Sequence, residues 1–144
     1  MTPTALGKRA RMLGDIDVSQ CLGIEIGALH APMVQRSEGR VLYADYASTE
    51  SLRANLRPPG VDPADVVDVD IVWDERRLCE AIPQPVDYIL ASHVAEHVPD
   101  LIGWPSELQA TIKPAGVVGL AIPDRRYTFD SYRQELRHPL IFVS

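Results

Sequence analysis

Five short apolar segments, separated by stretches of helical or turn-forming character, constrain the fold of this chain more than any other feature. They predict strands over residues 21–26, 40–44, 66–72, 86–91 and 117–122. Strands that alternate with helices form a parallel sheet with helices packed on both of its faces. The sequence therefore predicts an α/β fold with five main strands.

Helices are predicted over residues 4–13, 49–56, 77–82, 101–112 and 127–136. Ser48 precedes the second helix as its N-cap, and Pro105 restarts or kinks the fourth. A chain of 144 residues is long enough for a single domain with a sizeable core. We therefore expect one domain, with residues 1–20 as a helix and lead-in, 21–124 as the core and 125–144 as a short C-terminal segment.

The composition narrows the range of partners. The formal charge is −6, from 20 acidic and 14 basic residues, which disfavours a large nucleic-acid surface. No stretch is apolar enough to span a bilayer, and the first residues lack a signal-peptide core. Cys21 and Cys79 show no metal-binding or disulfide spacing. We expect a cytoplasmic protein without nucleic-acid, membrane or metal partners.

Polar side chains follow most of the predicted strands, at residues 27–29, 45–46, 73–74, 92–93 and 123–124. In open parallel sheets the ligand lies beyond the carboxyl ends of the strands. Asp45 lies twenty residues after Glu25, a spacing that suits a carboxylate holding a ribose. The loop after Gly27 lacks the further glycines of a dinucleotide fingerprint. This pattern favours an adenosine-containing cofactor without a bridging pyrophosphate.

Several motifs recur in a familiar order: Glu25-Ile26-Gly27, Asp45, residues 86–93, 96–100 and 113–116, and Ile122-Pro123-Asp124. In these motifs the chain resembles the class I S-adenosylmethionine-dependent methyltransferases of the type 11 group. The resemblance implies a Rossmann-like sheet that ends in an antiparallel hairpin. Only 20 residues follow Asp124, room for one short strand over 140–143, so we expect that hairpin to be missing or reduced and the chain to be a truncated member.

The resemblance implies a binding site for S-adenosylmethionine. By this likeness Asp45 accepts hydrogen bonds from both ribose hydroxyls, Asp74 meets the adenine amino group, and Trp73 packs beside the ring. The other implied cofactor contacts are Glu25, Gly27, Ala28, Leu29, Ser92 and His93. Ala28 departs from the pattern, because it adds a methyl group where the family often needs a glycine.

We expect the chain to be an enzyme that methylates a small-molecule or glycan acceptor. A base assists such a transfer when the acceptor is a hydroxyl or an amine. His97 is the first candidate for this base, His93 the second and Asp124 the third. The very apolar fifth strand, near a sheet edge, also predicts a homodimer through that edge.

Three other interpretations remain open. The altered loop and short C-terminus are compatible with a catalytically silent methyltransferase-like domain that acts through a partner chain. Residues 93–97 also fit the His-x-x-Glu-His pattern of a zinc protease. A nicotinamide-dependent oxidoreductase would retain the fold and Asp45, but it lacks the glycines that bring a helix N-terminus to a pyrophosphate.

Overall fold

A single parallel sheet of five strands organises the protein. The structure, a computed structural model, describes residues 3–56, 59–73 and 76–124. The sheet has the strand order β3-β2-β1-β4-β5 and every neighbouring pair is parallel. Its strands are β1 (Leu22–Ile26), β2 (Arg40–Asp45), β3 (Ile71–Val72), β4 (Val86–Ser92) and β5 (Ile112–Ala121). The predicted α/β fold with five strands is confirmed.

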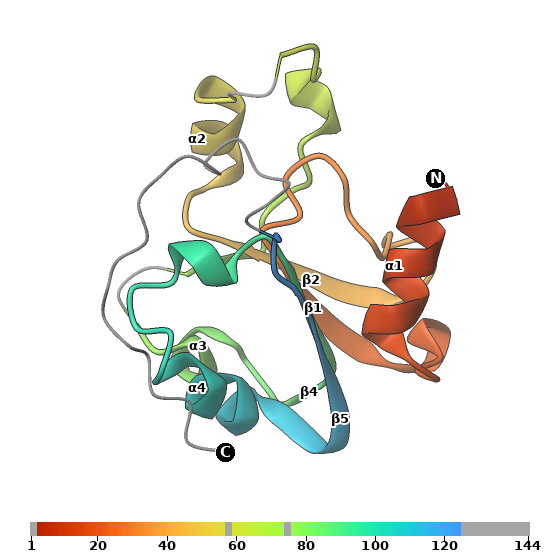
Figure 1. Cartoon of the computed structure of the whole chain (residues 1–144). Coiled ribbons are helices and arrows are strands. Elements are labelled where there is room, and N and C mark those ends of the chain that lie inside the picture. Colours follow the sequence, from red (N-terminus) through yellow and green to blue (C-terminus); the bar gives the residue numbers. More distant parts are fainter. Residues whose placement is uncertain (1–2, 57–58, 74–75, 125–144) are drawn as a thin grey trace.

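Helices cover both faces of this open sheet. The helices are α1 (Pro3–Leu13), α2 (Thr49–Ala54), α3 (Leu78–Ala81) and α4 (Trp104–Thr111), with 3-10 turns η1 (Val18–Gln20), η2 (Pro63–Asp65) and η3 (Ala95–His97). Figure 1 shows α1 on one side of the sheet, α3 and α4 together on the other, and α2 toward the top of the view. None of the helices in the described part of the chain is long and apolar enough to cross a membrane.

The core follows the alternation of side chains along the strands. On β4, Ile89 points to the face of α3 and α4, where it shares a buried cluster with Trp104. Tyr88 and Leu90 point to the opposite face, where they share a second buried cluster with Met12 of α1. Because both of its faces are covered, β4 is apolar along most of its length, as central parallel strands are.

The third strand is much shorter than the predicted segment 66–72, because β3 contains only Ile71 and Val72. The acidic residues that suggested a solvent-facing strand side have other partners. The Asp70 carboxylate accepts a hydrogen bond from the Tyr43 backbone N–H at 2.8 Å. The Tyr43 N–H therefore bonds to a side chain. In a longer β3 it would bond to a backbone carbonyl of that strand.

The fifth strand begins earlier than predicted but contains the predicted turn. Ile112 pairs with Val86, whereas Val117 pairs with Tyr88. Four residues of β5, 113–116, therefore lie opposite the one residue between Val86 and Tyr88, and Ala115 takes the left-handed φ of 63°. The Lys-Pro-Ala-Gly sequence acts as a large bulge inside the strand.

Local helix signals behave as the sequence indicated. The Ser48 side chain accepts a hydrogen bond from Ser51 N–H at the start of α2, and Pro105 lies in the first turn of α4. Both agree with the preference of these residues for helix N-termini. The predicted helix over 127–136, the strand over 140–143 and the question of a terminal hairpin lie outside the described residues.

Candidate functional site

An open cleft of about 790 Å³ lies at the carboxyl ends of β1, β2, β3 and β4. This is the edge where open parallel sheets bind ligands, and the volume falls within the range of small-molecule sites. The cleft is lined by Ile26, Gly27, Leu29, Asp45, Tyr46, Leu52, Trp73, His93, Val94, His97, Val98 and Pro99. Most of the lining is therefore apolar, with a few polar groups from separate strand ends.

Asp45 is the most informative polar group in the cleft. It ends β2 and is only 6% exposed. One carboxylate oxygen accepts a hydrogen bond from Tyr46 N–H at 2.8 Å, and the other has no partner among the residues that the structure describes. Burial raises the pKa of the Asp45 carboxyl, an effect that the Tyr46 hydrogen bond offsets in part. A buried carboxylate with an unused acceptor oxygen beside a cleft is arranged to receive donors from a ligand.

The loop after β1 brings backbone into the same cleft. Gly27 has a φ of 71° and Leu29 a φ of 49°, both in the left-handed region. A Cβ atom on Gly27 would lie 3.0 Å from a Val94 methyl group, so a side chain at this position would also crowd the loop after β4. Glycine is therefore favoured by both conformation and space.

Glu25 is buried behind this loop and binds its backbone instead of lining the cleft. It is 3% exposed, and its carboxylate accepts hydrogen bonds from Met33 N–H at 2.8 and 3.0 Å and from Val34 N–H at 3.2 Å. Burial raises the pKa of the Glu25 carboxyl, and these hydrogen bonds oppose the rise. Residues 27–39, which connect β1 to β2 and are all described, contain no helix. The buried Glu25 carboxylate therefore accepts hydrogen bonds from backbone N–H groups that have no helical partners in this connection.

Trp73 forms an aromatic wall of the cleft. Its backbone N–H donates to Asp45 O at 2.7 Å, which fixes the tryptophan beside the buried acid. Its ring stacks on that of Trp104 from α4, with centroids 6.4 Å apart and an interplanar angle of 19°. The wall is therefore backed by a fully packed side chain.

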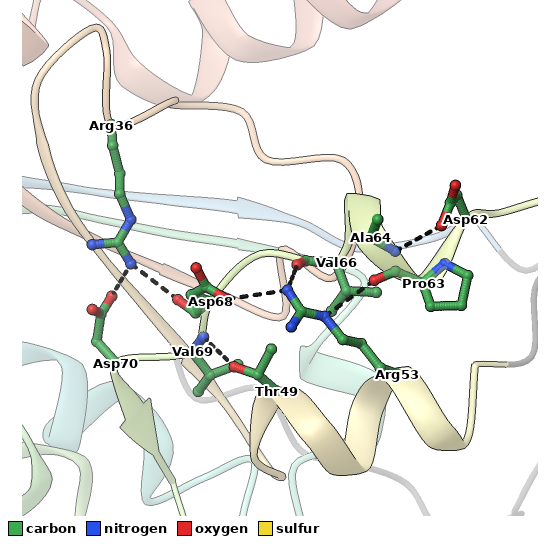
Figure 2. Close-up of polar contacts among 10 residues, drawn as sticks. All are labelled: Arg36, Thr49, Arg53, Asp62, Pro63, Ala64, Val66, Asp68, Val69 and Asp70. Carbon is green, nitrogen blue, oxygen red and sulfur yellow. Dashed lines mark hydrogen bonds and ion pairs between the residues drawn. The ribbon is translucent and has the colours of Figure 1, made fainter.

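Two arginines hold the segment that leads into β3, as Figure 2 shows. Arg53 of α2 donates to Pro63 O at 3.1 Å and Val66 O at 3.0 Å, and to the Asp68 carboxylate at 3.1 Å. Thr49 of the same helix accepts from a backbone N–H of this segment. Helix α2 is thereby tied to the chain just before β3.

The second arginine ties the same segment to β2. Arg36 donates to Asp68 O at 2.9 Å and to the Asp70 carboxylate at 2.7 Å. Its guanidinium also lies 5.0 Å from the ring centroid of Tyr43, a cation–π distance. Because β3 runs directly into Trp73, these contacts position the aromatic wall of the cleft.

The two histidines line the cleft but do not form a zinc-protease helix. His93 has a φ of 58°, and the following 3-10 turn covers only Ala95–His97. The side chains of His93 and Glu96 approach to 3.7 Å. The His-x-x-Glu-His mechanism needs both histidines on one face of a continuous helix, and the backbone here does not provide it.

The remaining predicted site residues lie elsewhere. Ala28 is buried in the cluster beneath α1, so its methyl group does not enter the cleft. Ser92 accepts a hydrogen bond from the Lys8 ammonium of α1 and does not line the cleft. Asp124 is exposed and is also absent from the lining. Asp74 lies outside the described residues.

Sequence reasoning gave two residues of the cleft wall no role, although it noted Tyr46 among the residues that follow a predicted strand. Tyr46 is 75% exposed at the cleft, and Leu52 of α2 is buried against it. The spacing of Leu52 on α2 indicated an apolar helix face. Nothing local indicated that this face would border the cleft instead of the core. No protein-family profile and no curated protein matches this chain.

Proposed function

We propose that the chain binds S-adenosylmethionine in this cleft and transfers its methyl group to a small-molecule or glycan acceptor. The observation that carries the proposal is Asp45, a buried carboxylate with one unused oxygen at the end of β2. A ribose presents two neighbouring hydroxyl donors, and a carboxylate has enough lone pairs to accept both. The resemblance in the sequence motifs points to the same cofactor.

The rest of the cleft fits an adenosine group. Gly27 allows close approach of the backbone after β1. Leu29, Leu52 and Trp73 provide apolar surface near the acid, which suits a purine ring. The helix-free crossover of residues 27–39 counts against a dinucleotide, because no helix N-terminus is present there to bind a pyrophosphate.

The chain's own residues would have simple tasks in such a reaction. S-adenosylmethionine supplies a methyl group that is already activated. Asp45 would hold the ribose, and the apolar walls would exclude water from one side of the cleft. His93 and His97 line the cleft and are able to accept a proton from an acceptor hydroxyl or amine. Asp124, outside the lining, ranks behind both as a candidate base.

The test is calorimetric titration with S-adenosylhomocysteine, the demethylated product. We expect the wild-type chain to bind and the Asp45→Ala variant to lose at least about 100-fold in affinity, since a hydrogen bond to a charged group contributes roughly 1.5–3 kcal/mol and two are lost. Asp15→Ala, which removes an exposed carboxylate from a turn, is the matched control and should bind normally. Unchanged affinity in Asp45→Ala would refute the assignment of the ribose site.

A catalytically silent domain is the second candidate. The helix-free connection of residues 27–39 favours it, because no helix N-terminus is available there to attract a negatively charged group of the cofactor. A silent domain would bind neither S-adenosylmethionine nor S-adenosylhomocysteine, although its thermal unfolding would show a normally folded protein. Competition by a nicotinamide dinucleotide would instead favour an oxidoreductase.

A further inference from the structure

Strand β5 ends the described sheet, with β4 on one side and no strand on the other among residues 3–124. The direction of its backbone groups can be worked out from one contact. His93 N–H donates to Ala121 O at 2.8 Å, so the backbone groups of Ala121 point toward β4. Backbone groups alternate in direction along a strand. Those of Val118 and Leu120 therefore point to the open edge, and extending the same alternation one residue past β5 directs those of Ile122 to it as well.

The same three residues also expose their side chains. Val118 is 38% exposed, Leu120 41% and Ile122 64%. On the opposite face of the strand, Gly119 packs directly against Met12 of α1. One face of β5 is thus covered by a helix, while the other presents an apolar stripe beside unpaired backbone groups. Such edges favour pairing with another chain.

We propose that this edge pairs antiparallel with β5 of a second copy, about a two-fold axis at Leu120. In that register Leu120 lies opposite Leu120 of the second copy, and Val118 lies opposite Ile122. All three positions direct their backbone groups outward, so each opposed pair exchanges two hydrogen bonds, about six in total. The exposed apolar side chains then contact one another across the axis.

Charge favours a second copy as the occupant. A two-fold interface must be self-complementary, and residues 116–122 contain no charged side chain that would meet its own copy. The chain as a whole carries a formal charge of −6, so two copies repel one another over most of their surfaces. Contact through the uncharged edge places no like charges directly against one another, and the remaining repulsion is screened beyond about 8 Å at physiological ionic strength.

The size of the contact sets the expected strength. One strand pair with its flanking side chains is smaller than the roughly 1,200–2,000 Å² of stable complexes. We therefore expect a concentration-dependent dimer with a dissociation constant on the order of micromolar. This dimer does not depend on what the cleft binds.

Sedimentation velocity of the full chain over a range of concentrations is the first test. We expect a monomer–dimer equilibrium, with a dissociation constant at least tenfold higher in Leu120→Glu, which places like charges opposite one another. Ile102→Glu is the matched control, since Ile102 is 81% exposed in the turn before α4 and should leave the equilibrium unchanged. A wild-type chain that remains monomeric would overturn the proposal and leave the edge to another occupant, residues 125–144 included.

Cysteine cross-linking tests the register and does not depend on Leu120→Glu folding normally. Under oxidation by diamide, Leu120→Cys should form a covalent dimer, because opposed residues lie within the reach of a disulfide. Val118→Cys should not, because the two copies of residue 118 are offset by about 13 Å along the strands. Equal cross-linking of both variants, or of neither, would contradict the proposed register. Cys21 and Cys79 are present in every sample and serve as the common background.

Discussion

Replacing Asp45 with asparagine should make the free protein more stable and its ligand binding much weaker. Asparagine keeps an oxygen that can accept the Tyr46 N–H, and it removes the charge from a residue that is only 6% exposed. The amide nitrogen that replaces the free oxygen is also unpaired, so the gain comes from removing a charge that burial destabilises. Because this group borders an open cleft, we expect a small gain, on the order of 1 kcal/mol. That gain corresponds to roughly 3 °C in Tm for a chain of this size.

The pH dependence of this gain has a definite sign. Burial raises the pKa of Asp45 above its ordinary value of 3.8. The stability linked to a raised carboxyl pKa is fully present below the unfolded value and is lost as the pH rises through the folded value. Wild type and Asp45→Asn should therefore be equally stable in acid. The variant's advantage should grow as the pH rises above 3.8 and then remain constant toward neutral pH.

Bound ligand reverses which of the two proteins, wild type or Asp45→Asn, is the more stable. At a concentration 100 times its Kd, S-adenosylhomocysteine stabilises the wild-type chain by about 2.7 kcal/mol, whereas a variant with 100-fold weaker binding gains only about 0.4 kcal/mol. Scanning calorimetry between pH 3 and pH 8, with and without the ligand, measures both effects. If Asp45→Asn lowers the Tm of the free protein and keeps its ligand-induced rise, Asp45 is a structural turn residue and the argument fails.

Three further predictions concern the scaffold of the cleft. Arg53→Met should lower the free energy of unfolding by about 1–2 kcal/mol in urea titrations, because a charged donor to three acceptors is lost. Gly23→Ala should cost about 3 kcal/mol, seen as a Tm drop of roughly 10 °C, because the new Cβ would overlap the buried Tyr88 ring. Asp87→Asn should destabilise the chain at pH 7 but much less below pH 3.8. The hydrogen bond from Leu22 N–H, aided by a lysine, lowers the pKa of Asp87, and that stability is lost as the pH falls through the folded value.

Matched controls separate these effects from general surface changes. Arg11→Met removes an exposed arginine of α1 and should leave the unfolding free energy within about 0.5 kcal/mol. Gly7→Ala places a methyl group in ordinary contact within α1 and should stabilise by about 0.5–1 kcal/mol. Asp15→Asn replaces an exposed turn carboxylate and should leave the unfolding free energy at pH 7 within about 0.5 kcal/mol. A Gly23→Ala chain as stable as Gly7→Ala would refute the packing argument.

The central strands were predictable because apolar runs bounded by turn residues have few alternative structures. β1, β2 and β4 lie within a residue of their predicted limits. The start of β3 was not predictable, because Asp68 and Asp70 bind Arg36 and Tyr43, partners about thirty residues away. Alternating acidic residues look the same in sequence whether they face water or bond to such distant groups.

The strand ends that form the site were predictable from the sequence, but which of their side chains enter the cleft was not. Asp45 and Trp73 reach the cleft because a parallel sheet gathers its carboxyl ends at one edge. Ala28 also follows a strand, yet it turns toward α1. Ser92 ends β4 and faces α1 because side chains alternate along the strand and it shares the side of Tyr88 and Leu90. The face that a side chain takes after a strand depends on loop dihedrals such as the φ of 71° at Gly27, and sequence spacing does not determine these.

The stacking of Trp73 on Trp104 gives the protein a built-in optical probe. The chain contains two tryptophans, and they lie together at one wall of the cleft. The whole of its indole emission therefore originates beside the proposed adenosine site. A ligand that replaces water against Trp73 should change the intensity or wavelength of that emission without any label, so compound libraries of adenosine analogues and acceptors can be screened on the unmodified chain.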